Sequence, residues 1–455
     1  MMSITVKADK LDESAAQERL AQEDEKSMRR VVMASVIGTT VEWYDFLLYG
    51  TAAALVFNKI FFPGLDPLMG TLAALGSFAV GFIARPLGGI VFGHFGDRVG
   101  RKSMLMLTMF LMGGGTFAIG LLPTYEQIGV WAPIALILLR VIQGFGIGGE
   151  WGGAALMVIE HAPRHRRGFY GSLVQVGFPL GMLASTGILA WLTRLPEDEF
   201  LSWGWRVPFL LSVVLVALGF YIRLQVVESP VFQASQKESG NDGARPDSDK
   251  APLWRILSEH RLNLFLSIGL KVCEVAWVYI LTVFVIVYGT SALDLPKGLI
   301  LDGVLLGAAL EVGFIPLFGW LSDKVGRRAM YYFGATFVLL SAYPLFLCLE
   351  TRDPLIIMGA IAACMTLGHG AMYGPQAAYL PELFGTRVRY SGASLGCQVA
   401  AGVGGGLAPM LATWLLARQG HYWGVAVMVV LLALVTLWAT RRSPETYRDD
   451  LTQTQ

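Results

Sequence analysis

The stretch Gly93-His94-Phe95-Gly96-Asp97-Arg98-Val99-Gly100-Arg101-Lys102 has a second copy in the chain, Gly319-Trp320-Leu321-Ser322-Asp323-Lys324-Val325-Gly326-Arg327-Arg328. Each copy directly follows a long apolar stretch, the second and the eighth such stretch along the chain. The match extends beyond this motif, because Glu160 and Arg167 correspond to Glu382 and Arg389 at a constant offset of 222 residues. The repetition indicates two related halves that run in the same order.

Twelve apolar stretches are each long enough to cross a hydrocarbon core of about 30 Å as a helix. They cover residues 31–57, 68–95, 103–122, 131–159, 168–192, 205–226, 263–289, 297–321, 329–349, 354–380, 390–417 and 421–440. Strands of a membrane barrel would instead alternate in polarity over about ten residues. The predicted fold class is therefore an all-α membrane protein, with twelve transmembrane helices in two pseudo-symmetric six-helix bundles.

The composition agrees with a membrane protein and argues against other classes. Hydrophobic residues make up 54% of the 455 residues and charged residues only 15%, whereas about a quarter of an ordinary globular domain is charged. A net charge of +1 gives no electrostatic basis for binding nucleic acid. The four cysteines fall in apolar runs without CxxC spacing, so we interpret them as small hydrophobic residues and expect no metal site.

Basic residues indicate how the chain is oriented. With the N-terminus in the cytoplasm, 26 of the 35 Lys and Arg residues lie in the tails and the even-numbered loops, and six lie in the opposite loops. The remaining three, Arg85, Arg140 and Lys271, lie inside spans. Because basic residues near span ends favour the cytoplasmic side, both termini are expected there.

We predict five segments along the chain. They are a cytoplasmic tail (1–30), an N-terminal six-helix bundle (31–226), a flexible cytoplasmic linker (227–262), a C-terminal six-helix bundle (263–440) and a second tail (441–455). In such repeats the substrate site lies between the two halves near the middle of the bilayer. We expect a monomer embedded in the lipid bilayer.

With these motifs the chain resembles the major facilitator superfamily over about residues 30–445. Four further motifs resemble its metabolite:proton symporter family: Glu42-Trp43-Tyr44-Asp45-Phe46 and the stretches 84–89 (ARPLGG), 148–153 (GGEWGG) and 381–390 (PELFGTRVRY). The resemblance implies transport by alternating access in the bacterial inner (plasma) membrane, with the proton as coupling ion and no other cofactor. Branches of that family carry shikimate, 2-oxoglutarate, citrate, or proline and betaine, and the first half together with 271–274 looks most like the shikimate branch.

The repeated motif predicts a cytoplasmic gate. Asp97 can accept hydrogen bonds from the N-terminus of a neighbouring helix, and the glycines permit close helix approach. The resemblance implies the same, a latch that breaks as the halves rock. The predicted gate residues are Gly93, Asp97, Arg98, Gly100, Arg101, Glu150, Gly319, Asp323, Gly326 and Arg327. The alternative is a basic loop that serves only to orient the chain.

Ionisable residues inside spans cost a few kcal/mol each and indicate function. Glu42, Asp45 and Tyr49 share one helical face, and Tyr49 is a candidate for substrate binding. Two carboxylates so close at low dielectric cannot both ionise easily, which suits a proton carrier. Arg140 begins a motif similar to the superfamily's fourth-helix motif, which is associated with proton coupling. The alternative is static pairing of one carboxylate with Arg140 or Arg85.

Several side chains are candidates for holding a small organic anion. Arg140 and Gln143 share a face, and a guanidinium fork suits a carboxylate. Arg85 is either structural or a second anion contact. Lys271 and Glu274 at i and i+3 either pair with each other or face the cavity.

Helix ten and helix eight add further candidates. His369, Tyr373 and Gln376 lie at i, i+4 and i+7, so Tyr373 and Gln376 are predicted to donate hydrogen bonds to the substrate. His369 is the only histidine at membrane depth, and it is either a proton relay or a hydrogen-bonded core residue. Glu311 has no obvious local partner and is a further candidate for proton coupling.

Together these residues predict a proton-coupled importer of a small organic acid such as shikimate or a di- or tricarboxylate, and not an enzyme. A proton-driven exporter and a proline/betaine symporter remain alternatives, the former because Gly177-Phe178-Pro179-Leu180-Gly181 loosely resembles an antiporter motif. No P-loop sequence is present, and Gly144-x-Gly146-x-x-Gly149 lies within a span, where helix packing explains it better than nucleotide binding.

Overall fold

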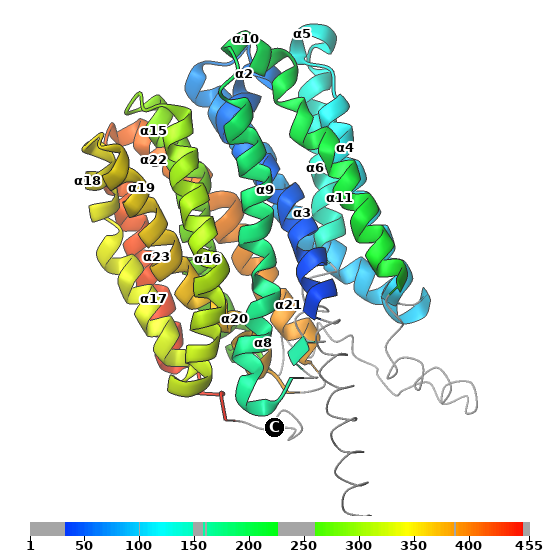
Figure 1. Ribbon diagram of the computed structural model, residues 1–455, viewed down its shortest axis with the longest axis vertical. Coiled ribbons are helices and arrows are strands. Elements are labelled where there is room, and N and C mark those ends of the chain that lie inside the picture. The colour runs from blue at the N-terminus through cyan, green and yellow to red at the C-terminus, as the bar shows by residue number, and fades with distance from the viewer. Residues whose placement is uncertain are drawn as a thin grey trace, which may run out of the picture.

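The computed structural model describes residues 32–99, 101–148, 158–159, 162–225, 260–385 and 388–448. Side chains are described for all of these except 89–90, 92–105, 222–225 and 390. The described residues form helices and connecting loops, with no strand among them. The helices run side by side along the long axis of the molecule (Figure 1), as expected where each backbone must satisfy its own hydrogen bonds in lipid.

The N-terminal half supplies the first six membrane helices. Its first helix covers residues 32–61, with a π-helical segment η1 (Ala53–Phe57) before α2 (Asn58–Phe61). The others are α3 (Pro67–Val99), α4 (Arg101–Leu121), α6 (Trp131–Ile147), η2 (Arg164–Arg166) with α8 (Arg167–Gln175) and α9 (Gly177–Leu192), and α10 (Glu197–Glu199) with η3 (Phe200–Gly204) and α11 (Arg206–Gln225). The short α5 (Tyr125–Ile128) lies in a loop.

The C-terminal half supplies the other six. They are α14 (Arg261–Tyr279) with η4 (Ile280–Phe284) and α15 (Val285–Ser291), α16 (Lys297–Val325), α17 (Arg327–Ser341) with α18 (Pro344–Glu350), α19 (Pro354–Ala363) with η5 (Cys364–Gly370) and α20 (Ala371–Glu382), α21 (Arg389–Ala401) with η6 (Gly402–Leu407) and α22 (Ala408–Gln419), and α23 (Trp423–Arg442). Local sequence sets some of these ends. Asp353 accepts hydrogen bonds from Leu355 N and Ile356 N at the start of α19, and Pro354 occupies its first position.

Every predicted span therefore has a helix. Among the described residues, eight helices are long and apolar enough to cross a membrane, or nine if α17 and α18, bent by 47°, form one span. Two shorter apolar helices, Met106–Leu121 and Trp131–Ile147, match the third and fourth spans, and the helical residues 32–61 match the first. The all-α class is confirmed. The predicted linker lies outside the described residues except for 260–262, so the predicted domain boundaries stay predictions.

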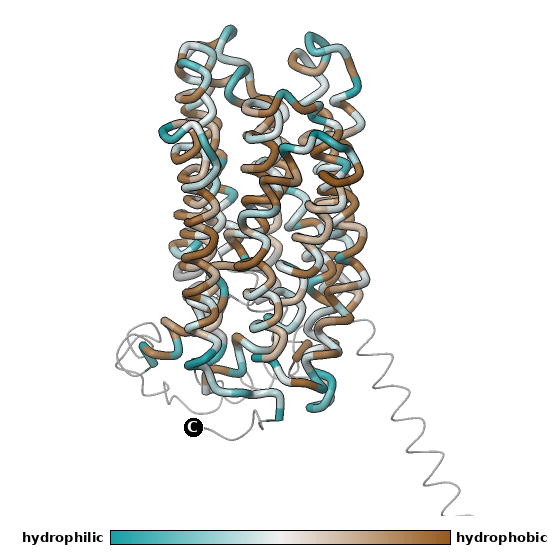
Figure 2. The backbone as a smooth tube through the Cα atoms, turned by 90° about the vertical axis from the view of Figure 1, so that its left-hand side faces the viewer, coloured by the Kyte–Doolittle hydropathy of each residue, from teal (hydrophilic) through white to brown (hydrophobic). Residues whose placement is uncertain are grey.

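The loops gather at two opposite ends of the molecule (Figure 1). We call the end with residues 162–166, 326, 383–385, 388 and 443–448 the inner end, and the end with α5, α10 and residues 351–353 the outer end. Figure 2 shows hydrophobic residues along the middle of the helices and hydrophilic residues concentrated at the ends. The naming follows the predicted orientation, which the basic residues support.

The two halves meet along helices from both. α8 packs on α16 and α20, α9 packs on α16, and α3 packs on η6 and α22. Several helices near the contact between the halves contain π-helical segments, among them η1, η4, η5 and η6. Such segments are frequent at functional sites. The face between the halves is thus lined by helices of irregular pitch.

Within the N-terminal half, α3 and α6 pack backbone against backbone. A Cβ added at Gly144 would lie 2.1 Å from Gly81 O, and one added at Gly88 would lie 1.8 Å from Phe145 O. Only glycine permits this approach, as is common between membrane helices. The contact matters for the site because α3 and α6 carry Arg85 and Arg140.

Replacing Gly144 tests this packing. We expect Gly144→Ala to push α6 away from α3 and to destabilise the protein by about 1–3 kcal/mol, the usual cost of overpacking. The apparent melting temperature of the purified protein in detergent should fall. Gly114→Ala in α4 is the matched control, because no atom lies within 4 Å of its added Cβ. Equal melting temperatures for the two variants would contradict the packing.

Candidate functional site

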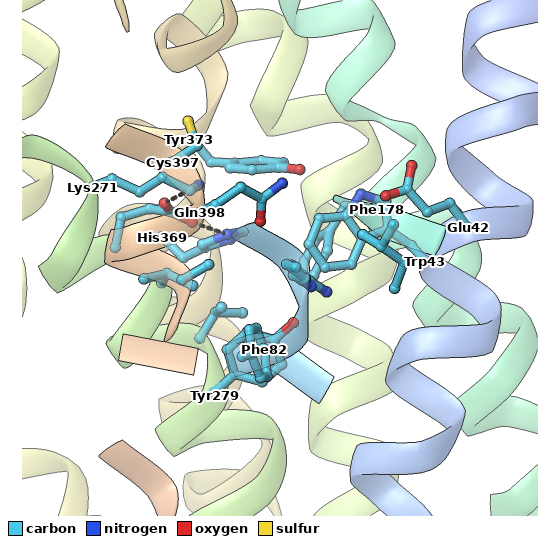
Figure 3. A pocket seen from close by; sticks show the side chains of 16 residues that line it. Glu42, Trp43, Phe82, Phe178, Lys271, Tyr279, His369, Tyr373, Cys397 and Gln398 are labelled. Atoms are coloured by element: carbon cyan, nitrogen blue, oxygen red, sulfur yellow. Dashed lines mark hydrogen bonds and ion pairs between the residues drawn. The ribbon is translucent and has the colours of Figure 1, made fainter. Parts of the chain in front are cut away.

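A pocket lies between the two halves and is lined by side chains from both (Figure 3). Its lining includes Glu42, Trp43, Phe82, Arg85 and Phe178 from the N-terminal half and Lys271, Glu274, Tyr279, His369, Tyr373, Cys397 and Gln398 from the C-terminal half. It encloses about 30 Å³, room for about two water molecules at roughly 10–15 Å³ each. An organic molecule therefore requires the halves to move apart before it enters.

Two arginines lie on the N-terminal side of the pocket, each with its guanidinium close to the same phenyl ring. The guanidinium carbon of Arg85 is 4.0 Å from the centroid of Phe46, and that of Arg140 is 4.2 Å from the same centroid. Arg140 also lies 4.2 Å from the ring of Tyr49, and Gly81 makes room for it, since an added Cβ would lie 2.5 Å from Arg140 Nε. These cation–π contacts compensate part of the cost of burying the two charges.

The two guanidinium groups keep unused hydrogen-bond donors. Arg85 Nε, Arg140 Nε and Arg140 Nη2 are buried, without a hydrogen-bond partner among the described residues. Arg140 Nη1 donates to Gln143 Oε1 at 3.3 Å, and Gln143 Nε2 donates to Thr116 Oγ1 at 2.7 Å. The predicted proximity of Arg140 and Gln143 is therefore present, and the site keeps positive charge and donors for an anion.

The acidic residues of the first helix take different places. Glu42 lines the pocket, whereas Asp45 does not. Asp45 is 3% exposed, and neither of its carboxylate oxygens has a hydrogen-bond partner among the described residues. Tyr49, on the same face, shares a 2.7 Å hydrogen bond with Ser77 Oγ. The helix thus presents one carboxylate to the pocket and buries the other.

In the C-terminal half the charged residues pair with one another. Lys271 Nζ lies 3.0 Å from Glu274 Oε2 and donates to Gln376 Oε1 at 2.6 Å, while Gln376 Nε2 donates to Glu274 Oε2 at 2.8 Å. The i, i+3 pairing of Lys271 with Glu274 is therefore formed. This closed triangle balances the lysine, although Lys271 and Glu274 also line the pocket.

His369 connects this triangle to helix α16. Its Nε2 lies 3.0 Å from Glu274 Oε1, and its Nδ1 lies 2.6 Å from Glu311 Oε1. Tyr373 stacks on the imidazole at 4.7 Å between ring centroids, and the Tyr373 hydroxyl has no partner among the described residues. Glu311, for which the sequence offers no local partner, thus finds one on another helix.

Six of the candidate residues line the pocket, namely Glu42, Arg85, Lys271, Glu274, His369 and Tyr373. The remaining candidates for proton coupling and substrate binding, Asp45, Tyr49, Arg140, Gln143, Glu311 and Gln376, lie behind them. Sequence reasoning gave no binding role to the aromatic lining residues Trp43, Phe82, Phe178 and Tyr279. The sequence marks these four residues only as aromatic, and aromatic residues are common throughout apolar spans.

The second copy of the repeated motif forms a contact between the halves at the inner end. Asp323 Oδ1 accepts from Gly168 N and Asp323 Oδ2 accepts from Phe169 N, both at 2.8 Å. These amides begin α8, where unpaired N–H groups and the helix dipole favour a carboxylate. Gly319 permits the approach, since an added Cβ would lie 2.6 Å from Gly168 O.

Arg327 extends this contact. It is fully buried and lies 2.8 Å from Asp323 Oδ1 and 3.3 Å from Glu382 Oε1. Gly326 precedes it with φ of +102°, a backbone conformation that side chains rarely adopt. In the first copy of the motif, Gly100 lies outside the described residues, and the side chains of Asp97, Arg98 and Arg101 and the surroundings of Gly93 are not described. Glu150, from another motif, also lies outside the described residues. The roles of these residues stay predictions.

At the outer end one exposed ion pair links the halves. Glu197 Oε1 lies 2.5 Å from Lys59 Nζ and 3.9 Å from Lys297 Nζ, and the Glu197 side chain is 60% exposed. Only the pair with Lys297 joins the two halves. Exposed pairs of this kind contribute about 0–1 kcal/mol, so this pair adds little to the closure of the outer end.

Comparison with known proteins gives consistent matches. The sequence profile described as Major Facilitator Superfamily matches residues 37–403. The chain is 45% identical to the Shikimate transporter of Escherichia coli (strain K12), covering 90% of this chain and 92% of that protein. It is 41% identical to the inner membrane metabolite transport protein YhjE of the same strain, with coverage of 91% and 95%. It is 34% identical to the Proline/betaine transporter of that strain, with coverage of 92% and 85%.

Two solved structures share the fold. One is the partially occluded inward open conformation of the xylose transporter XylE from E. coli, with a TM-score of 0.71, 16% identity and coverage of 92% of this chain and 98% of that chain. The other is a D-xylose-proton symporter, with a TM-score of 0.70, 19% identity and the same coverage. At these identities the likeness concerns the fold alone.

Asp323→Asn tests the inner-end contact. The change removes the charge that two amides and Arg327 share, and hydrogen bonds to charged groups contribute about 1.5–3 kcal/mol each. We expect the inner end to open more often. A cysteine at Ala377, buried against Gly171 beneath this contact, should then react with an impermeant maleimide at least about tenfold faster in inside-out vesicles.

Asp302→Asn is the matched control, since Asp302 is exposed near the other end of the same helix. We expect it to leave the rate of labelling at position 377 unchanged. Equal rates for Asp323→Asn and the parent protein would contradict the role of Asp323 in closing the inner end.

Proposed function

The chain belongs to the Major Facilitator Superfamily, and from that premise we propose that it imports a small organic anion together with a proton by alternating access. Its relatives are transporters and not enzymes, and the chain is a multi-pass membrane transporter. Coupling to the proton, the chemical class of the substrate and the direction of transport are the proposed parts.

The observation that carries the proposal is the pair of arginines around Phe46. Arg85 lines the pocket, Arg140 lies behind it, and both keep unused donors. A carboxylate that enters the pocket gains a planar fork of donors from Arg85 and the electrostatic attraction of both cations. Lys271 contributes less, because Glu274 and Gln376 already satisfy it.

Aromatic side chains and unused hydroxyl groups favour a hydroxylated ring. Trp43 and Phe178 meet edge to face at 5.0 Å, and Phe178 meets Tyr373 at 5.4 Å. Trp43 Nε1, Tyr279 Oη and Tyr373 Oη have no partner among the described residues, so each can bond a substrate oxygen. A cyclic hydroxy acid such as shikimate fits this chemistry, in line with the relative at 45% identity.

A betaine-like zwitterion is the second candidate. Aromatic lining also suits a quaternary ammonium group, and a relative at 34% identity carries the name Proline/betaine transporter. The two arginines favour a net anion over a zwitterion, since a zwitterion brings its own positive charge.

Proton coupling is proposed to begin at the first helix. Asp45 is buried near Arg140, and Glu42 faces the pocket. A proton on either carboxylate increases the net positive charge of the N-terminal site, which favours binding of the anion. Release of the proton restores the attraction between the carboxylate and the arginine, so protonation and substrate binding favour the same state.

The two ends differ in the contacts that close them, and this difference affects which end opens more easily. The inner end is closed by buried charged hydrogen bonds, and the outer end has one exposed ion pair between the halves. Opening toward the outside is therefore proposed to cost less, and an anion and a proton can enter there. Opening at the inner end requires Asp323 to leave the start of α8, after which both are released inside.

Uptake into proteoliposomes tests the proposed function. We expect accumulation of shikimate when the inside is alkaline, and its loss on adding a protonophore. The same vesicles would be offered 2-oxoglutarate, citrate, proline and betaine. Accumulation of betaine alone would favour the second candidate, and accumulation of none of these acids would contradict the proposal.

Arg85→Gln tests the anion site. Loss of its charged hydrogen bonds, about 1.5–3 kcal/mol each, should raise the apparent Kd for shikimate about tenfold or more. Arg418→Gln is the matched control, because Arg418 is exposed at the outer end, and its Kd should not change. An unchanged Kd in Arg85→Gln would contradict the assignment.

Asp45→Asn and Glu42→Gln test where the proton binds. We expect Asp45→Asn to abolish accumulation driven by a pH gradient and to retain exchange of labelled for unlabelled substrate, which needs no net proton movement. If both variants keep full pH-driven accumulation, the first helix does not carry the coupling proton.

A further inference from the structure

The C-terminal half contains an acid–base cluster that the proposed cycle does not use. Glu311 on α16, His369 on η5 and Glu274 on α14 come from three helices and are each at most 1% exposed. His369 lies between the two carboxylates, at 2.6 Å from Glu311 and 3.0 Å from Glu274. It belongs to a π-helical segment, which is a frequent feature of functional sites.

With Glu311 ionised and His369 neutral, this cluster carries a net negative charge, which one bound proton neutralises. Lys271 and Gln376 satisfy Glu274, which leaves Glu311 with His369. Glu311 Oε1 contacts the imidazole, but Glu311 Oε2 is buried with no hydrogen-bond partner among the described residues. A bare carboxylate there is costly. The neutral state of the pair therefore holds one proton, on the carboxylate or as an imidazolium beside it.

The geometry gives this proton a way in. His369 and Glu274 line the pocket, and Glu311 lies behind them. The imidazole has one nitrogen toward Glu274, on the pocket side, and the other toward Glu311. An imidazole can accept a proton on one nitrogen and release one from the other. A proton from the pocket can thus reach Glu311 through His369, and leave by the same route.

The N-terminal half covers this entrance. Phe178 on α9 lies with its ring centroid 5.0 Å from that of His369 and 5.4 Å from that of Tyr373 (Figure 3). When the halves rock apart, Phe178 moves with the N-terminal half and His369 stays with the C-terminal half. Water then gains access to the imidazole in an open state and loses it in the closed one.

Other charged or titratable groups surround the cluster from each helix packed on η5 and across the pocket. They are Lys271 and Tyr279 on α14, Tyr331 on α17, Tyr373 on α20, Cys397 on α21, and Glu42 and Arg85 across the pocket. Lys271 is paired with Glu274, and the Arg85 guanidinium lies against Phe46 on the N-terminal side. The group that can change charge at least cost is therefore the pair of Glu311 and His369.

We propose that Glu311 and His369 form a second proton-binding site, loaded through the pocket and covered by Phe178, so that each import cycle moves two protons, one bound in each half. The inference rests on the proposed function and deepens it. Import of a monoanion with one proton moves no net charge, whereas import with two protons moves one positive charge inward. The inference therefore predicts that the membrane potential drives transport.

The test measures uptake of labelled shikimate by the full chain in proteoliposomes, with a potassium diffusion potential set by valinomycin and no pH gradient. The parent protein should accumulate shikimate when the inside is negative, by up to about tenfold for each 59 mV. Glu311→Gln should lose this accumulation and still respond to an inside-alkaline pH gradient. Glu350→Gln, at the exposed outer end of α18, should respond to the potential as the parent does.

The outcomes separate the two proposals. Parent protein that accumulates shikimate with a pH gradient but not with a potential would overturn the second site and leave the proposed function intact. A potential response in Glu311→Gln equal to that of the parent would also overturn the second site. Parent protein that accumulates no acid under either gradient would overturn both.

Phe178→Ala gives an independent measurement. Without the phenyl cover, His369 should stay accessible from the pocket, and vesicles with this variant should take up protons faster than parent vesicles in the absence of substrate. Phe178→Leu keeps most of the cover and should restore a low leak. Phe178→Ala vesicles as tight to protons as parent vesicles would overturn the proposal whatever Glu311→Gln shows.

Discussion

Burying a charge at membrane depth is costly unless another group compensates it, and the two halves of this molecule meet that cost differently. The C-terminal half uses ion pairs: Lys271 with Glu274, and His369 between two carboxylates. The N-terminal half uses aromatic faces, with the guanidinium groups of Arg85 and Arg140 both close to the ring of Phe46. A phenyl ring compensates the charge of a guanidinium less completely than a carboxylate does. The N-terminal half therefore keeps positive charge that an anion could neutralise. In the proposed mechanism, this difference assigns anion binding to the N-terminal half and one proton to each half.

The small size of the pocket means that substrate can bind only when the two halves move apart. With room for only a few water molecules, neither half can bind substrate without the other moving away. The same movement takes Phe178 off His369 and separates α8 from Asp323 or opens the outer ion pair. In the proposed mechanism, substrate binding, proton access to His369 and gating therefore all depend on the same movement of one bundle relative to the other. A pocket that opened by movement of a loop alone would not connect them.

The fold class and the positions of the spans could be predicted from the sequence, because long runs of apolar residues are a property of the chain itself. The candidate site could be predicted in part. Charges inside spans stood out one by one, and the i, i+3 spacing of Lys271 and Glu274 allowed either a pair or two cavity-facing groups, of which the structure shows the pair. The partner of Glu311 could not be found, since His369 is 58 residues away on a helix whose rotation depends on the π-helical segment η5. Trp43, Phe178 and Tyr279 were missed because aromatic residues are common in all spans, and only the assembled halves distinguish those at the pocket.

Asp323 accepts hydrogen bonds from the backbone amides of Gly168 and Phe169 in the opposite half. That choice of partner affects how the protein can change over evolutionary time. A gate made of two side chains is lost when either residue mutates, and its repair needs a matched second change. Here one side of the contact is present in any sequence that starts a helix at this place, provided that small residues keep the two backbones close. Substitutions can therefore accumulate in the first turn of α8 as substrates diverge, while the closing contact is inherited unchanged.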